Sequence, residues 1–399
     1  MGKEMNKKNT WNQYTIKNVN KSLVLETILN KSPISRADIA NETNLNKGTV
    51  SSQVTELLGE GLIHEKGPGE SKGGRRPVML LFNEKAGYSI GIDIGVNYIL
   101  GIRTDLVGNI CEESKTYFHD LSFDHIKEKL FNVIDQLIQS APPSEYGIVG
   151  IGIGVPGAVN KEGKILLAPN LGWENVDIKE MIHHRYACPV IIENEANAGV
   201  YGEKNFGPGR WEEDIVYVSV GVGIGVGLFL NGELYRGADG FSGELGHMTV
   251  EGTGYRCRCG NQGCWELYAS EQALGSSSHV NGKKNLEDPL THMIEKAEKG
   301  DQDAVDTFHS IGTYLGIGLT NIINSFNPKR VIIGNRITAA QSWIEQPMME
   351  KTNQNALWFH QESLKIHFSE FHSHSSALGM AAFTFEKFLK VNIHEHMMV

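Results

Sequence analysis

The sequence predicts an α/β protein in which a winged helix-turn-helix precedes a body of two similar α/β lobes. Three observations lead to this fold class. Helical patterns joined by a tight turn lie near the N-terminus, a glycine-rich segment flanked by strand patterns follows them, and a strand–glycine turn–strand pattern then occurs twice. We expect an N-terminal tail at 1–16 and the helix-turn-helix with its wing at 17–82.

Charge is divided unevenly along the 399 residues. Residues 1–76 hold 12 Lys and Arg against 8 Asp and Glu, net +4, and the remainder holds 25 against 39, net −14. A basic piece on an acidic body is typical of a DNA-binding module attached to another domain, and a merely solvated surface is the alternative. No apolar run approaches the roughly 18 residues that span a bilayer and no signal-peptide pattern is present, so we expect a cytoplasmic protein without membrane contact.

Two helices are expected before the turn of the basic piece. The first covers residues 19–30, and its apolar face consists of Val19, Leu23, Leu25, Ile28 and Leu29. Ser35 and Asp38 form a capping-box pattern, which predicts that a second helix begins near Arg36 and ends before Asn44.

A third helix is expected to read DNA. Asn46 caps it, and one buried face recurs at Val50, Val54, Leu57 and Leu58. Its N-terminal end and polar side would then meet base edges, as in a helix-turn-helix. The candidate DNA contacts from these helices are Ser35, Arg36, Asn46, Lys47, Thr49, Ser51, Ser52 and Gln53. An ordinary helical hairpin with a polar exposed face is the alternative.

A cationic hairpin follows the third helix directly. Two short strand patterns flank a glycine-rich loop that carries Lys66, Lys72, Arg75 and Arg76. Lysine and arginine there would neutralise DNA phosphates, which sets affinity and its salt dependence. The hairpin is therefore predicted to be a wing, with Lys72, Arg75 and Arg76 as further DNA contacts.

Similar strand patterns open the two halves of the acidic body. Residues 87–110 and 214–237 each contain a strand, a glycine turn, a second strand and a tight turn with Gly-Asn or Asn-Gly. Duplicated lobes would leave a cleft between them, which is a usual place for a small ligand. The glycine turns permit close approach of phosphate, and simple hairpin geometry is the alternative.

Polar residues follow the apolar strands of the first half. Gly157 lies in the turn of GIGVPGAV, Asn170 lies in APNLGW, and VIIENEANAG places Asn194 and Glu195 after a buried strand. Ligand sites in α/β folds form at strand ends. Carboxylates and amides suit a polyol because they bond to neighbouring hydroxyls, and helix capping is the alternative use.

Three of the five cysteines lie within a short segment: Cys257, Cys259 and Cys264. With His247, ten residues before Cys257, they supply three thiolates and one imidazole. This set fills a tetrahedral zinc site and leaves no position open for water, so we predict a structural zinc ion. Chance clustering or a redox pair is the alternative. The isolated Cys111 and Cys188 are expected to fill the core.

These motifs resemble those of the ROK family of sugar kinases and repressors over about residues 87–390. The resemblance rests on GIGVPG, ENEANAG, GVGIG, GELGH and, most specifically, CRCGNQGCWE. It implies a duplicated actin-like or ribonuclease H-like fold that binds sugar between its lobes. The first lobe would occupy 83–200, with a C-terminal helix at 376–390 returning to it, and the second lobe, with the zinc knuckle, would occupy 201–375.

The resemblance also implies the sugar contacts. Carried over by motif, they are Gly157, Asn170, Asn194, Glu195, Gly223, Glu244, His247 and Glu266. His247 would place one ring nitrogen on zinc and the other toward the sugar, so the metal would fix its tautomer and orientation.

Four positions depart from the pattern of the family's kinases. The first phosphate loop, D-x-G-G-T, is replaced by residues 93–97, DIGVN, and the second, G-T-G, by residues 221–223, GVG. A glycine run near the adenosine site is replaced by residues 334–336, GNR, and the catalytic aspartate by Glu195. One added methylene moves a carboxylate by about 1 Å, which can cost on the order of 100-fold in rate. We therefore expect a sugar sensor with no catalytic residues, and an ATP-dependent hexose kinase is the alternative.

The whole chain, with its winged helix-turn-helix, resembles the repressors of this family that respond to xylose in low-GC Gram-positive bacteria. The resemblance implies D-xylose as the effector and operator DNA as the partner. We expect a homodimer on a pseudo-palindromic operator, because isologous dimers match two-fold DNA sites. Sugar that closes the cleft would change the spacing of the two DNA-binding domains and release the operator. A pure interaction module is a more distant alternative.

Overall fold

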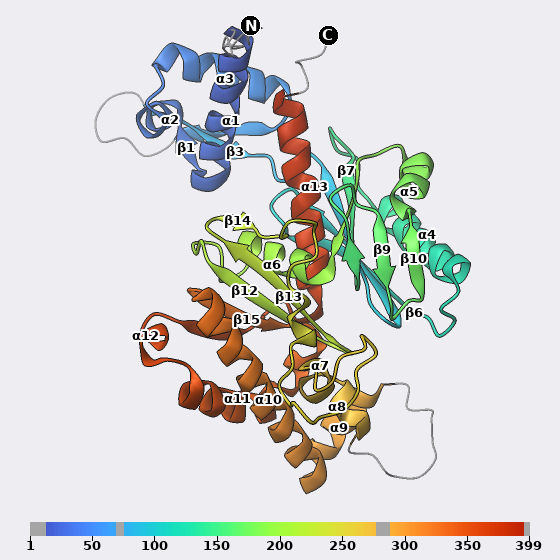
Figure 1. Ribbon diagram of the computed structural model, residues 1–399. Helices are drawn as coiled ribbons and strands as arrows, with labels where there is room; N and C mark the ends of the chain where they lie inside the picture. Colours follow the sequence, from blue (N-terminus) through green and yellow to red (C-terminus); the bar gives the residue numbers. More distant parts are fainter. Residues whose placement is uncertain (1–12, 69–75, 277–287, 395–399) are drawn as a thin grey trace, which may run out of the picture.

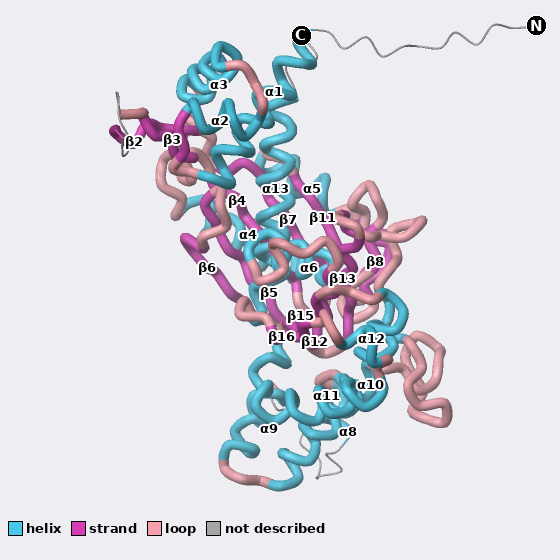
Figure 2. Tube along the Cα trace, turned by 90° about the vertical axis from the view of Figure 1, so that its left-hand side faces the viewer, coloured by secondary structure: helices cyan, strands magenta, loops and turns pink. Residues whose placement is uncertain are grey.

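A computed structural model of the protein describes residues 13–68, 76–276 and 288–394 (Figure 1). The molecule is elongated, with the N-terminal domain at one end and the helices of the second lobe at the other (Figure 2). Within the described ranges, every helix is too short or too polar to cross a membrane.

The N-terminal domain is a winged helix-turn-helix. Its helices are α1 (Gln13–Lys31), α2 (Arg36–Thr43) and α3 (Lys47–Gly59), and its strands are β1 (Ile34–Ser35), β2 (Ile63–Pro68) and β3 (Val78–Phe82), in the order β1-β3-β2. The Ser35 side chain accepts a hydrogen bond from the Asp38 amide at 3.2 Å, and Asn46 accepts one from the Thr49 amide at 2.8 Å. Both predicted caps are confirmed, because these oxygens satisfy amides that the first helical turn leaves free.

The apolar face predicted for the first helix is wrong in part. Val19 and Leu23 are 40% and 37% exposed, whereas Val24, Leu25 and Ile28 are buried. The inward side also carries Lys21, whose ammonium pairs with Glu56 of α3 at 3.0 Å. The helix is therefore rotated relative to the prediction, because an ion pair with α3 occupies part of its buried face.

Two five-stranded sheets form the body, and they have the same topology. The first has the order β11-β7-β4-β5-β6 and the second β14-β13-β12-β15-β16. In each, the central strand (β4 or β12) pairs antiparallel with the next strand in sequence and parallel with a later one. The predicted duplication is therefore confirmed. The first sheet consists of β4 (Tyr88–Ile94), β5 (Tyr98–Asp105), β6 (Ile110–Tyr117), β7 (Ile148–Val155) and β11 (Val190–Asn194). The second consists of β12 (Ile215–Val220), β13 (Ile224–Leu230), β14 (Glu233–Leu234), β15 (Arg330–Gly334) and β16 (Lys365–Phe368).

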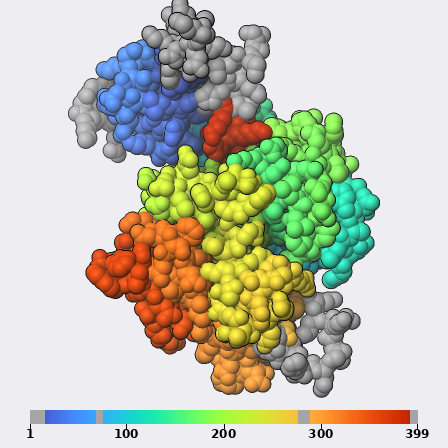
Figure 3. Space-filling view, viewed as in Figure 1, coloured from blue at the N-terminus to red at the C-terminus, as the bar shows by residue number. Residues whose placement is uncertain are grey.

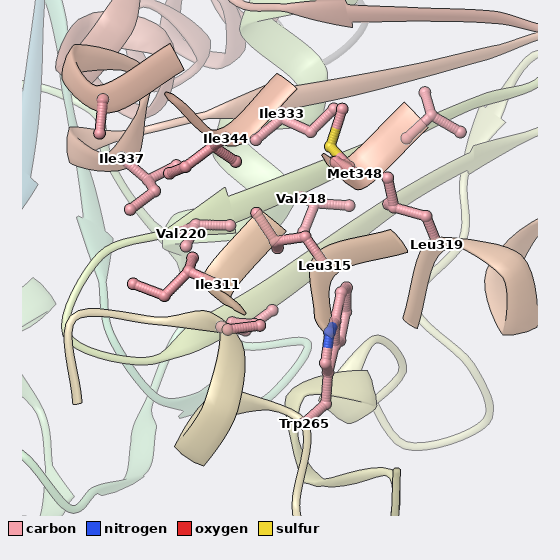
Figure 4. Packing of buried hydrophobic residues seen from close by; sticks show 14 of the residues in the cluster. Val218, Val220, Trp265, Ile311, Leu315, Leu319, Ile333, Ile337, Ile344 and Met348 are labelled. Carbon is pink, nitrogen blue, oxygen red and sulfur yellow. The ribbon is translucent and has the colours of Figure 1, made fainter. Parts of the chain in front are cut away.

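Helices and a small sheet surround these strands. The first lobe adds α4 (Phe123–Gln139), β8 (Ala158–Val159), β9 (Ile165–Ala168), β10 (Trp173–Val176) and α5 (Ile178–Tyr186). The second adds η1 (Glu244–His247), α7 (Glu266–Ala269), α8 (Gln272–Ser276), α9 (Pro289–Glu298), α10 (Gln302–Phe326), η2 (Arg336–Ala340), α11 (Gln341–Asn355), α12 (Trp358–Gln361) and η3 (His372–His374). Residues of α10 and α11 pack on β12 and β15 to form the core of this lobe (Figure 4).

Two helices lie between the sheets: α6 (Glu195–Phe206) and α13 (Ser375–His394). The sequence allows backbones to touch there, because a Cβ on Gly91 would lie 1.9 Å from the carbonyl oxygen of Ala377, and one on Gly379 would lie 1.7 Å from that of Ala198. The boundary expected at residue 200 falls inside α6, which packs on the second sheet as well as on α13.

The helix α13 also reaches the N-terminal domain, and its end emerges between that domain and the first lobe (Figure 3). The rings of Phe82 and Phe385 lie 6.2 Å apart, and those of Tyr146 and Phe388 lie 4.9 Å apart. Phe388 belongs to one buried cluster that joins α1–α3 to the first lobe. The N-terminal domain is therefore held on the first lobe by a shared apolar core rather than by a free linker.

The isolated cysteines do not both fill the core as expected. Cys111 is exposed, because it lies in the edge strand β6, whose residues mostly face solvent. Cys188 is partly buried just before β11.

Candidate functional site

The predicted metal ligands converge in the second lobe. One ligand atom each from His247, Cys257, Cys259 and Cys264 lies within 4.8 Å of the others. The Cys257 Sγ is 3.7 Å from His247 Nδ1, and the Cys259 and Cys264 sulfurs are 3.6 Å apart. Zinc–sulfur bonds of about 2.3 Å in a tetrahedron place neighbouring sulfurs about 3.8 Å apart, so the four side chains fit a closed four-coordinate site.

Local backbone structure brings these ligands together. Gly260 and Gly263 adopt φ values of 95° and 73°, which allow the chain to reverse between the last two cysteines. An isolated bridge joins Thr249 to Cys264, and the Asn261 amide donates to the His247 carbonyl at 3.1 Å. The knuckle is therefore closed by its own hydrogen bonds.

Trp265 anchors the knuckle to the core of the second lobe. Its side chain is fully buried, its indole nitrogen donates to the Tyr314 carbonyl at 2.7 Å, and its ring lies against α10, where a Cβ on Gly318 would be 2.0 Å away (Figure 4). Because Trp265 lies between Cys264 and Glu266, it also sets the position of Glu266. Sequence patterns did not predict this role, although Trp265 stands between a predicted metal ligand and a candidate sugar contact.

Two carboxylates lie beside the knuckle. The Glu266 Oε1 accepts from the Cys257 thiol at 3.3 Å and lies 3.5 Å from His247 Nδ1. Gly223 is next to Glu266, because a Cβ there would be 2.8 Å from Glu266 Oε2. Burial raises the pKa of Glu244 above its usual value, and the nearby His247 only partly opposes this rise. The predicted residues Gly223, Glu244, His247 and Glu266 therefore form one group.

Glu195 joins this group from the first residue of α6. Burial, and after it the carboxylate of Asp93, raises the pKa of Glu195 to about 8, and Glu244 contributes in the same direction. The hydroxyl of Ser219 hydrogen-bonds to Glu195 and opposes this rise. Asp93 is only 2% exposed, and burial raises its pKa as well. Two carboxyl groups in one buried place cannot both ionise easily.

Asn194 is engaged as a helix cap. Its Oδ1 accepts from the amides of Ala196 and Asn197 at 2.9 and 3.2 Å, and its Nδ2 donates to the Gly157 carbonyl at 3.0 Å. The capping alternative thus describes what Asn194 does, and it ties Gly157 to the start of α6. Asn170 lies in the turn after β9 and is partly buried.

The side chains of Asn335 and Arg336, where a departure from kinase motifs was expected, are both paired. The guanidinium of Arg336 pairs with Glu271 at 2.8 Å and also with Asp288. Asn335, at a φ of 69°, donates to the Ser219 hydroxyl at 2.9 Å. The side chains of Asn335 and Arg336 therefore lie over the end of the second sheet, after β15.

The DNA-binding candidates divide into three groups. Asn46, Lys47, Ser51 and Ser52 are exposed at the start of α3, and Thr49 is partly buried there. Arg76 is exposed just before β3. Ser35 is buried as the cap of α2, and Arg36 pairs with Glu65 at 3.1 Å. Lys72 and Arg75 lie outside the described residues.

Gln53 does not face outward as predicted. It is 3% exposed, because its position on α3 lies beside Val50, Val54 and Leu57 on the buried side. The prediction relied on the polar residue type of Gln53 and therefore assigned it to the wrong face of α3.

Comparisons with known proteins agree with this architecture. The model of the ROK family matches residues 89–387, and that of winged helix-turn-helix DNA-binding domains matches residues 18–64. The chain is 46% identical over 377 residues to the xylose repressor of Bacillus subtilis, covering 94% of this chain and 97% of that protein. It is 28% identical over 391 residues to the N-acetylglucosamine repressor of Escherichia coli O157:H7, covering 96% of each.

Solved structures show the same body. A ROK family transcriptional regulator described as a homologue of the E. coli MLC protein superposes with a TM-score of 0.78 at 28% identity, covering 95% of this chain and 98% of that one. A ROK family glucokinase from Streptomyces griseus, in complex with glucose and AMPPNP, gives 0.67 at 26% identity, covering 74% and 99%. The chain belongs to the ROK family and carries an N-terminal winged helix-turn-helix DNA-binding domain.

Proposed function

We propose that the protein is a transcriptional repressor that binds operator DNA through its winged helix-turn-helix and releases it when D-xylose occupies the cleft between its lobes. The observation that carries this proposal is the shared apolar core of α13, the first lobe and the N-terminal domain. A sugar-dependent change in the lobes would therefore reach the DNA-binding domain directly. Similarity to xylose repressors over 94% of the chain supports the choice of sugar.

The sugar would lie among Glu195, Gly223, Glu244, His247 and Glu266. Carboxylates there accept hydrogen bonds from hydroxyls, and the protonated form of Glu195 donates one. A zinc ion held by the three thiolates and His247 Nδ1 would be structural, because its four positions are filled by protein. The remaining nitrogen of His247 is then fixed in direction and free to bond to a hydroxyl.

A kinase reaction is the second candidate, and the site argues against it. Glu195 is a longer acid than the aspartate of family kinases, and it carries a raised pKa beside Asp93. A base that holds its own proton is poorly suited to take one from a sugar. Arg336, paired with Glu271 and Asp288, occupies the region where those kinases have glycine.

The repressor would act as a homodimer on a pseudo-palindromic operator. Because the N-terminal domain packs on the first lobe, rotation of that lobe would move each reading helix and alter their spacing. Sugar must bind the released form more tightly for this to work. A preference of roughly 100-fold corresponds to about 2.7 kcal/mol of coupling.

Titration of an operator complex with aldoses at fixed salt tests the proposal. We expect D-xylose to lower operator affinity and other aldoses to act more weakly. Calorimetry with the same sugars, repeated with ATP while ADP is monitored, separates the two candidates. Heat without ADP supports the sensor, and sugar-dependent ADP or an operator complex indifferent to xylose contradicts it.

A further inference from the structure

Arg236 is the place where the two lobes and α13 meet. It follows β14 in the second lobe, and both its Nε and one terminal nitrogen lie 2.8 Å from Glu193 Oε2 of β11 in the first lobe. Its guanidinium also lies 5.8 Å from the centre of the Phe383 ring on α13. One side chain therefore contacts all three parts of the body.

Glu193 fixes the turn that carries two candidate sugar contacts. It is 7% exposed, and its other oxygen, Oε1, accepts from the Asn194 amide at 2.9 Å and from the Asn197 side chain at 3.1 Å. The two carboxylate oxygens thus have different partners, since Oε1 holds the start of α6 and Oε2 receives Arg236. A movement of Arg236 would displace the carboxylate that orients Asn194 and, after it, Glu195.

Contacts of α13 lead from Arg236 toward the DNA-binding domain. Phe383 stacks on Tyr201 of α6 with ring centres 3.8 Å apart, and the Tyr201 hydroxyl bonds to Glu386. Two residues beyond Phe383, Phe385 meets Phe82 of β3. The other end of α13 reaches the first sheet, because Ser376 lies close to the buried Asp93 of β4.

The lobes have room to move around Arg236. A cavity of about 600 Å³ lies between them, lined by both Glu193 and Arg236 and by residues 159–161 and 234–237. Lys161 crosses the same gap, where its ammonium donates to the carbonyl of Ala238 at 2.8 Å, away from the start of α6 and from α13. Lys161 is therefore a matched control for a contact that merely bridges the lobes.

We propose that Arg236 is a positioning residue that couples occupancy of the sugar site to the DNA-binding domain through Glu193 and Phe383. This rests on the proposed sugar-responsive repression. Arg236 touches neither sugar nor DNA; it makes the position of the β11–α6 turn depend on the second lobe and on α13. Losing it should leave each binding activity in place and weaken the link between them.

The test compares Arg236→Gln, Arg236→Lys and Lys161→Ala in the full chain. Without sugar, we expect the operator affinity of Arg236→Gln to lie within about threefold of that of the parent. The factor by which saturating D-xylose weakens operator binding should be smaller in Arg236→Gln by about tenfold or more. Arg236→Lys keeps the charge but loses the second nitrogen that contacts Glu193, so its sugar effect should be intermediate. The sugar effect in Lys161→Ala should match that of the parent. A parent-like factor in Arg236→Gln, or an equal loss in Lys161→Ala, overturns the proposal.

Two further measurements keep the result decisive. Glu193→Gln retains an acceptor for the turn while weakening the pair with Arg236, so it should lose the same coupling if Arg236→Gln folds poorly. Hydrogen exchange over residues 190–200 without sugar should be faster in Arg236→Gln than in Lys161→Ala, and equal exchange overturns the positioning role. If no aldose changes the operator affinity of the parent protein, the proposed function is contradicted. The hydrogen-exchange comparison still tests the positioning role of Arg236 in that case.

Discussion

The hydroxyl of Tyr98 donates a 2.7 Å hydrogen bond to Asp93 across the first glycine turn. The Tyr98 ring also covers Gly95, where a Cβ would lie 2.1 Å from the ring. The Tyr98 side chain therefore pairs with the carboxylate of Asp93 and also covers the backbone of the turn at Gly95. Burial and the neighbouring Asp93 raise the pKa of Tyr98 well above its usual range, so the hydroxyl remains a donor at physiological pH.

This closed turn predicts that the protein does not phosphorylate sugar. ADP release with saturating xylose or glucose should stay at the background rate, and restoring one kinase residue by Val222→Thr should not change that, because Tyr98 and Arg336 still fill the loops. A coupled ADP assay checks this, with the sugar-free protein as control. Sugar-dependent ADP in the parent would contradict it.

Loss of one thiolate should separate sugar binding from DNA binding. Cys259→Ser should release zinc and weaken sugar affinity, because the knuckle positions His247 and Glu266, while operator affinity without sugar stays near that of the parent. Metal analysis, calorimetry and operator titration measure the three effects. The exposed Cys111→Ser serves as control, and a parent-like zinc content in Cys259→Ser would refute the ligand assignment.

The wing should contribute charge rather than sequence recognition. Arg76→Ala should weaken binding to all operator sequences and reduce the slope of log affinity against log salt by about one. Sugar affinity should not change. Lys127→Ala, which removes a partly buried charge on α4 outside the N-terminal domain, is the control. An unaltered salt slope in Arg76→Ala would remove the wing from the DNA interface.

Stability should fall with rising pH because of Glu195. The folded protein keeps this proton up to about pH 8, whereas the unfolded chain releases it near the ordinary pKa of 4.5. The folded state binds more protons between these values, so the free energy of unfolding decreases as pH rises through that window. Glu195→Gln should flatten the decrease in urea unfolding measured from about pH 5 to about pH 8. Identical slopes for parent and variant would place the proton elsewhere.

Local patterns predicted much of this molecule. The caps at Ser35 and Asn46, the repeated strands and the spacing of His247 from the cysteines depend on residues near one another in the chain, so short-range rules suffice. Arg236 and Glu193 are 43 positions apart, and no residue pattern links them. Gln53 was misplaced for a related reason: residue type suggested a surface position, while packing within the domain decided its burial.

The reach of α13 has a consequence for synthesis of the protein. A ribosome completes the reading helix and the metal ligands long before it arrives at Ser375, yet the apolar support of the reading helix is finished only when Phe388 has been added. A transcript interrupted before that codon yields a DNA-binding domain without its support and a first lobe without its inner layer. Such truncated chains therefore lack the apolar contacts through which α13 holds the DNA-binding domain on the first lobe.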